Sequence, residues 1–175
     1  MKKTILIAAM ILGIIVMSGC LRPATGTLVL QITDAPPELN ITKALVTISK
    51  VEVHLTGAGE EENATTEAGW HTVVNESQTF DLIAIKDAKE FLGSAELGPG
   101  KYTQIRLTIG KAEATIDGNE WDLAIPSTTV KLVQNFSIEA GQTTTLTLDF
   151  DAQESIHPAG EGQYVMRPTI KVIQE

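Results

Sequence analysis

The sequence predicts an all-β protein, an antiparallel β-sandwich with Greek-key connections of the immunoglobulin- or transthyretin-like kind. Three observations favour this fold class: apolar and polar residues alternate along most of the chain, turn residues recur at regular spacing, and helical periodicity is almost absent. We expect about nine or ten short strands in a single domain over residues 26–175. A closed barrel made of the same strands is the alternative.

The first half of the domain is expected to contribute four strands. In GTLVLQIT, Leu28, Leu30 and Ile32 share one face, and the prolines of DAPPELN end that strand. The run ALVTISKVEVHL changes its apolar parity near Ser49–Lys50, which predicts a β-bulge. WHTVV and TFDLIAI are interpreted as short strands, and KDAKEFLG as one or two helical turns. Trp70 is interpreted as a core residue, with a carbohydrate-stacking platform or a residue at the edge of the sandwich as the alternatives.

The second half follows the same alternation. Tyr102 comes after the turn residues LGPGK and is expected to pack at a sheet corner, with its hydroxyl bonded to the backbone. Asp117-Gly118-Asn119 tolerate positive φ and predict a hairpin. Trp121 shares the parity of Leu123 and Ile125 and is assigned to the core. VKLV, FSIEAG, TTLTLDFD and YVMRPTIKVI complete the predicted strands.

The first twenty residues have the layout of a secretory signal. Two lysines precede an apolar run over residues 5–16, and small residues follow it. The run is shorter than the ~20 residues that a membrane-spanning helix needs. Residues 17–20, MSGC, resemble a lipobox. We therefore expect residues 1–19 to be a lipoprotein signal peptide and residues 20–25 a short tether that begins with lipidated Cys20. The alternative is an ordinary signal peptide with an incidental cysteine.

Lipid on Cys20 makes the membrane the first expected partner of this chain. It predicts an extracytoplasmic, membrane-anchored location, at the cell surface or in the periplasm. Cys20 is the only cysteine, so an intrachain disulfide and a metal cluster of several thiolates are both excluded.

The composition is acidic. The chain has 22 Asp and Glu against 13 Lys and Arg, a formal net charge of −9. Loss of residues 1–19 removes two lysines and leaves 11 basic and 22 acidic residues, a net charge of −11. This balance argues against nucleic acid as a partner, because phosphate recognition needs clusters of Lys and Arg. It fits solubility outside the cell and the attraction of divalent cations.

Asparagine usage points to the surface of a secreted protein. Four of the five asparagines lie in N-x-[ST] sequons: Asn40, Asn63, Asn75 and Asn135. The motif predicts exposed positions, and N-glycosylation in an organism that has the machinery for it.

Three carboxylates form a candidate metal site. Asp149 and Asp151 lie two apart on a predicted strand, so their side chains would share a face ~6.8 Å apart. With Asp34 nearby, they could bind calcium, the one cofactor this sequence suggests. The alternative is that Asp149 and Asp151 are solvated and Asp34 caps the turn before Pro36. The pair also has the spacing of a glycosidase acid and base, a third interpretation that an aromatic content of 5% opposes.

Six stretches together resemble one family. They are ITDAP, VEVH, FDLIAI, YTQIRLTI, LDFDAQESI and YVMRPTIKV, in this order over about residues 26–173. They are similar to the extracytoplasmic lipoprotein family of domain of unknown function 4382. The resemblance implies a lipid-anchored, all-β surface protein and no particular activity. His157 stands after ESI, where the family pattern leads us to expect an apolar residue.

The motifs of common enzyme classes are absent from the sequence, which contains no G-x-S-x-G, H-E-x-x-H, G-x-G-x-x-G or P-loop. We expect a binding, adhesion or envelope-structure module, not an enzyme. Loops 34–42, 57–69 and 110–120 would offer contact surface to envelope proteins or glycans. A calcium-dependent binding protein is the alternative, and a carbohydrate-active enzyme is the third possibility. Glu52 and His54 share a strand face and are considered as ligands of a zinc site, which needs three or four converging ligands. Their spacing is common on the outer face of any strand, so it does not predict such a site.

Overall fold

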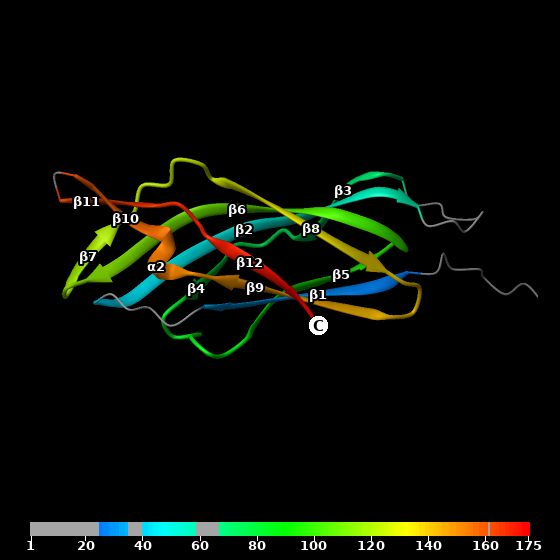
Figure 1. Ribbon diagram of the computed structural model, residues 1–175, viewed down its shortest axis with the longest axis horizontal. Coiled ribbons are helices and arrows are strands. Elements are labelled where there is room, and N and C mark those ends of the chain that lie inside the picture. The colour runs from blue at the N-terminus through cyan, green and yellow to red at the C-terminus, as the bar shows by residue number, and fades with distance from the viewer. Residues whose placement is uncertain (1–24, 35–39, 59–66, 161) are drawn as a thin grey trace, which may run out of the picture.

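Two β-sheets packed face to face make up the body of the protein (Figure 1). The computed structural model describes residues 25–34, 40–58, 67–160 and 162–175. The smaller sheet has the strand order β12 (Ile170–Gln174), β9 (Thr143–Phe150), β1 (Gly26–Asp34), β5 (Glu90–Leu97). The prediction of an all-β sandwich is confirmed. The pairing is not antiparallel throughout, because β1 and β9 run parallel.

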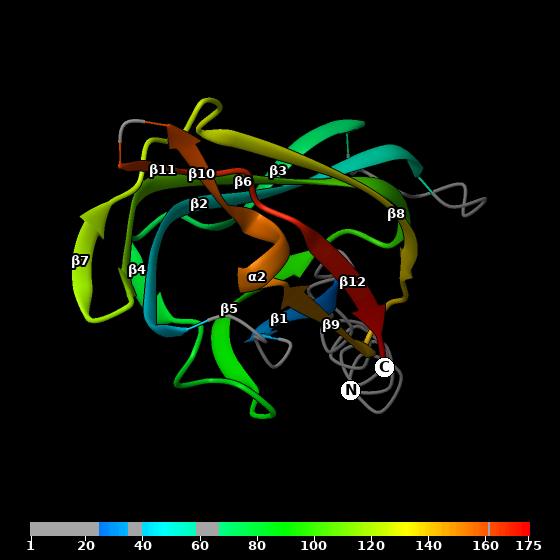
Figure 2. The same cartoon turned by 60° about the vertical axis from the view of Figure 1, so that its left-hand side comes forward.

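The larger sheet has six strands. Its main path is β3 (Gly69–Val74), β2 (Ile41–Ala58), β6 (Gly100–Ile116), β7 (Asn119–Asp122), with β4 (Gln78–Asp81) also paired to β2 and β8 (Thr129–Ile138) also paired to β6. A hairpin of β10 (Ile156–Gly160) and β11 (Gln163–Met166), with the short helix α2 (Ala152–Ser155), lies at one end of the sandwich (Figure 2). Contacts of β3 with β5, and of β12 with β8, bring the two sheets together at their edges.

The core lies between the two sheets and follows the predicted alternation. In β1, Leu28, Leu30 and Ile32 are fully buried, and the residues between them are half-buried. Leu146 and Leu148 of β9 lie beside Leu30 and Ile32 in the same sheet and are also fully buried. Burial of such side chains contributes roughly 1.5–3 kcal/mol each, which makes this layer the main source of stability.

The predicted bulge in β2 is confirmed. The register of β2 against β6 shifts between Ile48 and Lys50. Because a bulge inserts one extra residue, both apolar runs of β2 keep the core face, with Val46 and Ile48 before it and Val51 after it all buried.

Tyr102 anchors a corner of the larger sheet, as predicted. It is completely buried, its Oη donates a hydrogen bond to the Gly98 carbonyl at 2.9 Å, and its ring stacks on Phe136 at 5.2 Å between centroids. Burial raises the pKa of Tyr102 to about 12. The predicted hairpin is confirmed as well: Asp117 (φ 50°) and Gly118 (φ 78°) form the turn between β6 and β7.

Two local predictions are wrong near residues 81–97. TFDLIAI is a strand only as far as Asp81, because the Asp81 carbonyl accepts hydrogen bonds from Ala84 and Ile85 and starts a turn. Leu82 and Ile85 of this turn are buried. The apolar residues that suggested a strand are therefore apolar because they pack in the core. KDAKEFLG forms no helix; its second half begins β5, which pairs with β1.

The last segments also differ from the prediction. VKLV and FSIEAG form one strand, β8, while YVMRPTIKVI is divided into β11 and β12 around Pro168, whose missing N–H cannot extend a ladder. None of the helices in the described residues has the length and hydropathy to cross a membrane. Cys20, Asn63 and most of the loop over residues 57–69 lie outside the described residues.

Candidate functional site

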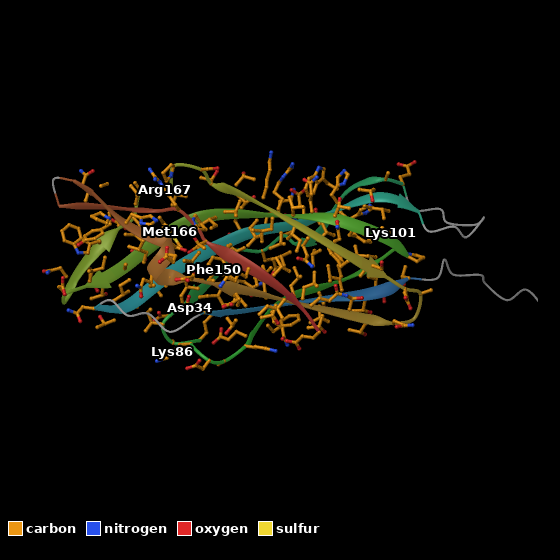
Figure 3. All side chains as sticks on the ribbon, viewed as in Figure 1. Asp34, Lys86, Lys101, Phe150, Met166 and Arg167 are labelled. Carbon is orange, nitrogen blue, oxygen red and sulfur yellow. The ribbon has the colours of Figure 1, made fainter. Side chains whose placement is uncertain are left out.

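The three carboxylates of the predicted calcium site do not come together. Asp34 is 3% exposed and lies opposite Phe150 on the core side of the smaller sheet, where its Oδ1 accepts a hydrogen bond from the Ala152 N–H at 2.9 Å (Figure 3). Asp149 precedes Phe150 and therefore faces the other side, between Thr33 and Lys171. Within the part of the chain that the structure describes, no group of three or more His, Cys, Asp or Glu side chains could hold a metal ion.

Asp151 has a structural role that its spacing from Asp149 did not suggest. It is the N-cap of α2, and its Oδ1 accepts a hydrogen bond from the Glu154 N–H at 2.9 Å. Buried Ser155 donates its hydroxyl to the Asp151 carbonyl at 2.5 Å and accepts from the Thr169 N–H at 2.9 Å. These bonds hold the segment before β12 against the end of β9. The stretch DFDAQES therefore acts as a structural junction.

The sequons within the described residues are at the surface, as predicted. Asn40, Asn75 and Asn135 are exposed. The Asn40 side-chain amide donates to the Asp117 carboxylate at 3.0 Å. Attachment of sugar at these positions stays a prediction.

Trp70 is on the outer face of the larger sheet, so its assignment to the core is wrong. The register of β3 against β2 shifts between Val51 and Glu52, which places Trp70 opposite His54 and not opposite a core residue. The row continues across β6 and β8 to Gln104 and Val133, and Val133 is 83% exposed.

A second row runs beside the first on the same face. Thr72 of β3, Glu52 of β2, Arg106 of β6 and Lys131 of β8 are register partners across the four strands. We call these two rows, with Lys50 and Lys101, the aromatic–basic face. Side chains with nitrogen tips stand out from this side of the larger sheet, away from the smaller sheet (Figure 3).

Aromatic contacts hold the cation in the centre of this face. The Arg106 guanidinium carbon lies 3.9 Å from the centroid of the Trp70 ring, in cation–π geometry. His54 meets the same ring edge-on, with 4.9 Å between centroids and 63° between planes. Such a cation–π contact contributes ~0.5–1 kcal/mol at an exposed site. Arg106 is therefore fixed in position by a ring and not by a carboxylate.

Arg106 forms no ion pair with its neighbours in the described part of the chain. Its register partner Glu52 accepts instead from the Lys50 ammonium, at 2.6 Å. The described residues give the Arg106 guanidinium no hydrogen bond and no ion pair, and its Nε is buried without a partner. His54 Nδ1 is also buried and has no hydrogen-bond partner among the described residues. The Arg106 guanidinium is therefore held in a fixed orientation, and the described part of the protein does not use its N–H groups as hydrogen-bond donors.

Positive charge is concentrated on this half of the sheet. Residues 50–56, 69–74, 100–108 and 129–137 contain four cations, Lys50, Lys101, Arg106 and Lys131, against the single carboxylate of Glu52. The chain as a whole has a net charge of −9. These strand segments thus bear more cations than carboxylates, although the chain as a whole is acidic and the segment over residues 57–68 adds four Glu.

The opposite end of the same outer face is acidic and paired. Lys111 contacts Glu113 at 2.6 Å and Asp122 at 3.7 Å. The hydrogen bond from Lys111 lowers the pKa of Glu113, and the same bond raises the pKa of Lys111. A shallow pocket of about 350 Å³ lies here, lined by Lys43, Glu113, Glu120, Asp122 and four neighbouring residues.

Sequence reasoning missed the aromatic–basic face although part of its signal was visible. Glu52 and His54 share a parity in β2, and Gln104 and Arg106 share one in β6. The contact of Arg106 with Trp70 depends on the bulge that shifts β3, which the sequence does not mark.

Comparison with known proteins gives a family and distant structural likenesses. The family model described as "Domain of unknown function (DUF4382)" matches residues 25–168. Comparison with curated proteins gives no match. A candidate cell adhesion protein from Bacteroides eggerthii is 12% identical over 86% of this chain and 55% of its own, with a TM-score of 0.34. A second, from Bacteroides ovatus, is 13% identical over 85% of this chain and 44% of its own, with a TM-score of 0.27. This chain thus spans about half the length of each.

Proposed function

The chain belongs to the DUF4382 family, and we propose that it is a lipid-anchored extracytoplasmic binding module, acting in adhesion or envelope structure and not as an enzyme. The observation that carries the proposal is the aromatic–basic face. It presents an oriented, unneutralised guanidinium and further cations on an open sheet surface, which suits recognition of a large partner.

The arrangement suits binding better than catalysis. The aromatic–basic face contains Glu52 and His54, but the Glu52 carboxylate is engaged by Lys50 and the described contacts of His54 are with Trp70. Asp149 and Asp151 are the candidate acid and base pair. Asp149 lies between Thr33 and Lys171, and Asp151 is the N-cap of α2. A calcium-dependent module is not favoured, since Asp34 and Asp149 face opposite sides of the sheet.

Anchoring through Cys20 would keep this binding surface near the membrane. Residues 21–25 separate the lipidated cysteine from β1, and five extended residues reach at most ~18 Å. The module would therefore act on partners at or close to the membrane surface.

The anchor is tested by replacing Cys20 with serine in the full chain expressed in cells. We expect the wild-type protein to partition into the detergent phase and to carry the mass of a lipid group, and Cys20→Ser to lose the mass of the lipid. Met17→Leu, which brings the motif nearer to the usual lipobox, is the matched control and should be processed like the wild type. A wild-type protein that lacks the mass of a lipid group on Cys20 would contradict lipid anchoring.

Binding is tested with the lipoprotein purified in mild detergent. Cosedimentation with envelope material from the producing organism should be saturable and weakened by Arg106→Gln. Lys111→Gln, at the paired end of the same sheet, should bind like the wild type. Absence of any saturable cosedimentation would overturn the binding module.

A further inference from the structure

We propose that the aromatic–basic face binds an anionic polysaccharide, one that bears carboxylate or sulfate groups, laid across the strands of the larger sheet. The inference rests on the proposed binding function and names the class of its ligand. It follows from the charge, the geometry and the chemistry of this face.

The charge favours an anionic ligand. Arg106 is held on the Trp70 ring at 3.9 Å, and the only carboxylate of the face is engaged by Lys50. A guanidinium has a planar fork of donors that fits the oxygens of a carboxylate or a sulfate. Since Arg106 makes no ion pair within the described residues, a ligand anion would provide the first one for a side chain that the Trp70 ring already holds in place.

The geometry favours an extended polymer over a single small anion. Register partners in neighbouring strands are separated by ~4.8 Å, so the row from Thr72 to Lys131 spans ~14 Å across β3, β2, β6 and β8. Arg106 and Lys131 are adjacent in this row, and Lys50 flanks it on β2, where it is paired with Glu52. A chain with repeated negative groups can contact several of these cations at once, which a small anion cannot do.

The chemistry favours a polysaccharide over an acidic peptide. The face combines ring surface from Trp70 and His54 with the amide of Gln104 and the hydroxyl of Thr72. These groups suit hydroxyl-rich ligands that also have small apolar patches. Val133 is the one large apolar side chain of these rows that is strongly exposed, so side chains of a peptide would find little apolar surface to bury. The backbone groups of the two inner strands, β2 and β6, are also committed to the ladders on both of their sides.

Affinity electrophoresis of the detergent-purified lipoprotein tests the proposal. The gels contain polygalacturonate, dextran sulfate, neutral dextran or poly-glutamate. We expect one or both of the anionic polysaccharides to retard the protein, and added salt to weaken that retardation because exposed charges are screened. Neutral dextran and poly-glutamate should have little effect. The first two gels distinguish carboxylate from sulfate as the group recognised.

Matched variants locate the site. Arg106→Gln should raise the apparent dissociation constant about tenfold, the usual scale for loss of one charge-assisted bond. Lys131→Gln should raise it by a smaller factor. Lys111→Gln removes the same charge at the paired end and should leave binding unchanged. Thermal unfolding of each variant identifies those that are misfolded, and Lys131→Gln, an exposed position, serves if Arg106→Gln does not fold.

Each outcome decides the proposal. Retardation by neither anionic polysaccharide would overturn it. Equal retardation by poly-glutamate would indicate an acidic protein partner or unspecific charge, and would also overturn it. Binding that Lys111→Gln weakens as much as Arg106→Gln would place the site elsewhere. In all three cases the cosedimentation test can still succeed, so failure of this ligand class is distinguishable from failure of the binding module.

Discussion

The two ends of the outer face of the larger sheet use positive charge in different ways. At the β7 end, Lys111 is paired with Glu113 and Asp122, and the charges cancel locally. At the β3 end, Arg106 is placed on Trp70, and its register partner Glu52 is paired with Lys50. Exposed ion pairs contribute little to stability and leave little charge for a ligand. A cation that is held by an aromatic ring can still form an ion pair with a ligand. This difference distinguishes the solvated β7 end from the candidate binding surface at the β3 end.

The largest effect is expected from Tyr102, which supports the aromatic–basic half from the core side of β6. Burial raises the pKa of Tyr102 to about 12, so the folded state favours the neutral phenol. This contribution to stability is complete below the ordinary pKa of ~10 and is lost as the pH rises from there through about 12. Two pKa units correspond to ~2.7 kcal/mol. Urea unfolding between pH 9 and pH 12 should show this loss.

Tyr102→Phe provides the reference for that experiment. It lacks the ionisable group, so its free energy of unfolding should fall less steeply over the same pH range, although it also loses the hydrogen bond to Gly98, worth ~1 kcal/mol. Tyr164→Phe should keep the wild-type slope. If Tyr102→Phe and the wild type have parallel pH profiles, the buried phenol does not control the alkaline stability of this half.

A double-mutant cycle compares the two ends directly. Trp70→Ala and Arg106→Gln should show a coupling free energy of ~0.5–1 kcal/mol in chemical unfolding, because each variant removes the same cation–π contact. The cycle of Lys111→Gln and Glu113→Gln should give a smaller coupling, because this ion pair is exposed to solvent. Equal coupling at the two ends would remove the distinction between them.

A smaller effect is expected in the titration of Glu113. The hydrogen bond from Lys111 lowers the pKa of Glu113, so the contribution of this ion pair to stability is complete above the ordinary carboxyl pKa and is lost as the pH falls through the lowered value. NMR titration should show the Glu113 pKa below its ordinary range in the wild type and closer to that range in Lys111→Gln. High salt should have the same effect as the variant, because the pair is exposed. A Glu113 pKa that neither change affects would contradict pairing at this end.

The regular parts of the fold could be predicted because they depend on local patterns. The alternation in β1, the bulge in β2 and the Asp117-Gly118 turn each follow from neighbouring residues. The role of Asp34 could not be predicted in this way. Its partner Ala152 lies 118 residues away and reaches it only because β9 runs parallel beside β1. Asx-turn chemistry is local, whereas the contact with Ala152 depends on the order of the strands in the sheet.

The candidate site was missed for a related reason. Trp70 belongs to an apolar-looking strand, and its face depends on a shift of one residue near Val51–Glu52. A shift of one residue moves every following side chain to the other side of the sheet. Its contact with Arg106 further requires that β3 and β6 lie on either side of β2. Bulge position and strand order are tertiary properties, so the residues were visible in the sequence but their juxtaposition was not.

The smallest effect is expected from the addition of calcium. This experiment tests the acidic end of the outer face as well as Asp34, Asp149 and Asp151. A ligand present at a hundredfold excess over its dissociation constant stabilises a protein by ~2.7 kcal/mol. We expect the unfolding midpoint of the lipoprotein to be equal in calcium and in EDTA, because Asp34 bonds inward to Ala152 and Asp149 faces outward. A calcium-dependent rise that Asp149→Asn abolishes would restore the aspartate site. A rise that Glu113→Gln abolishes would instead make the acidic end a cation site, and the outer face would then bind ions of opposite sign at its two ends.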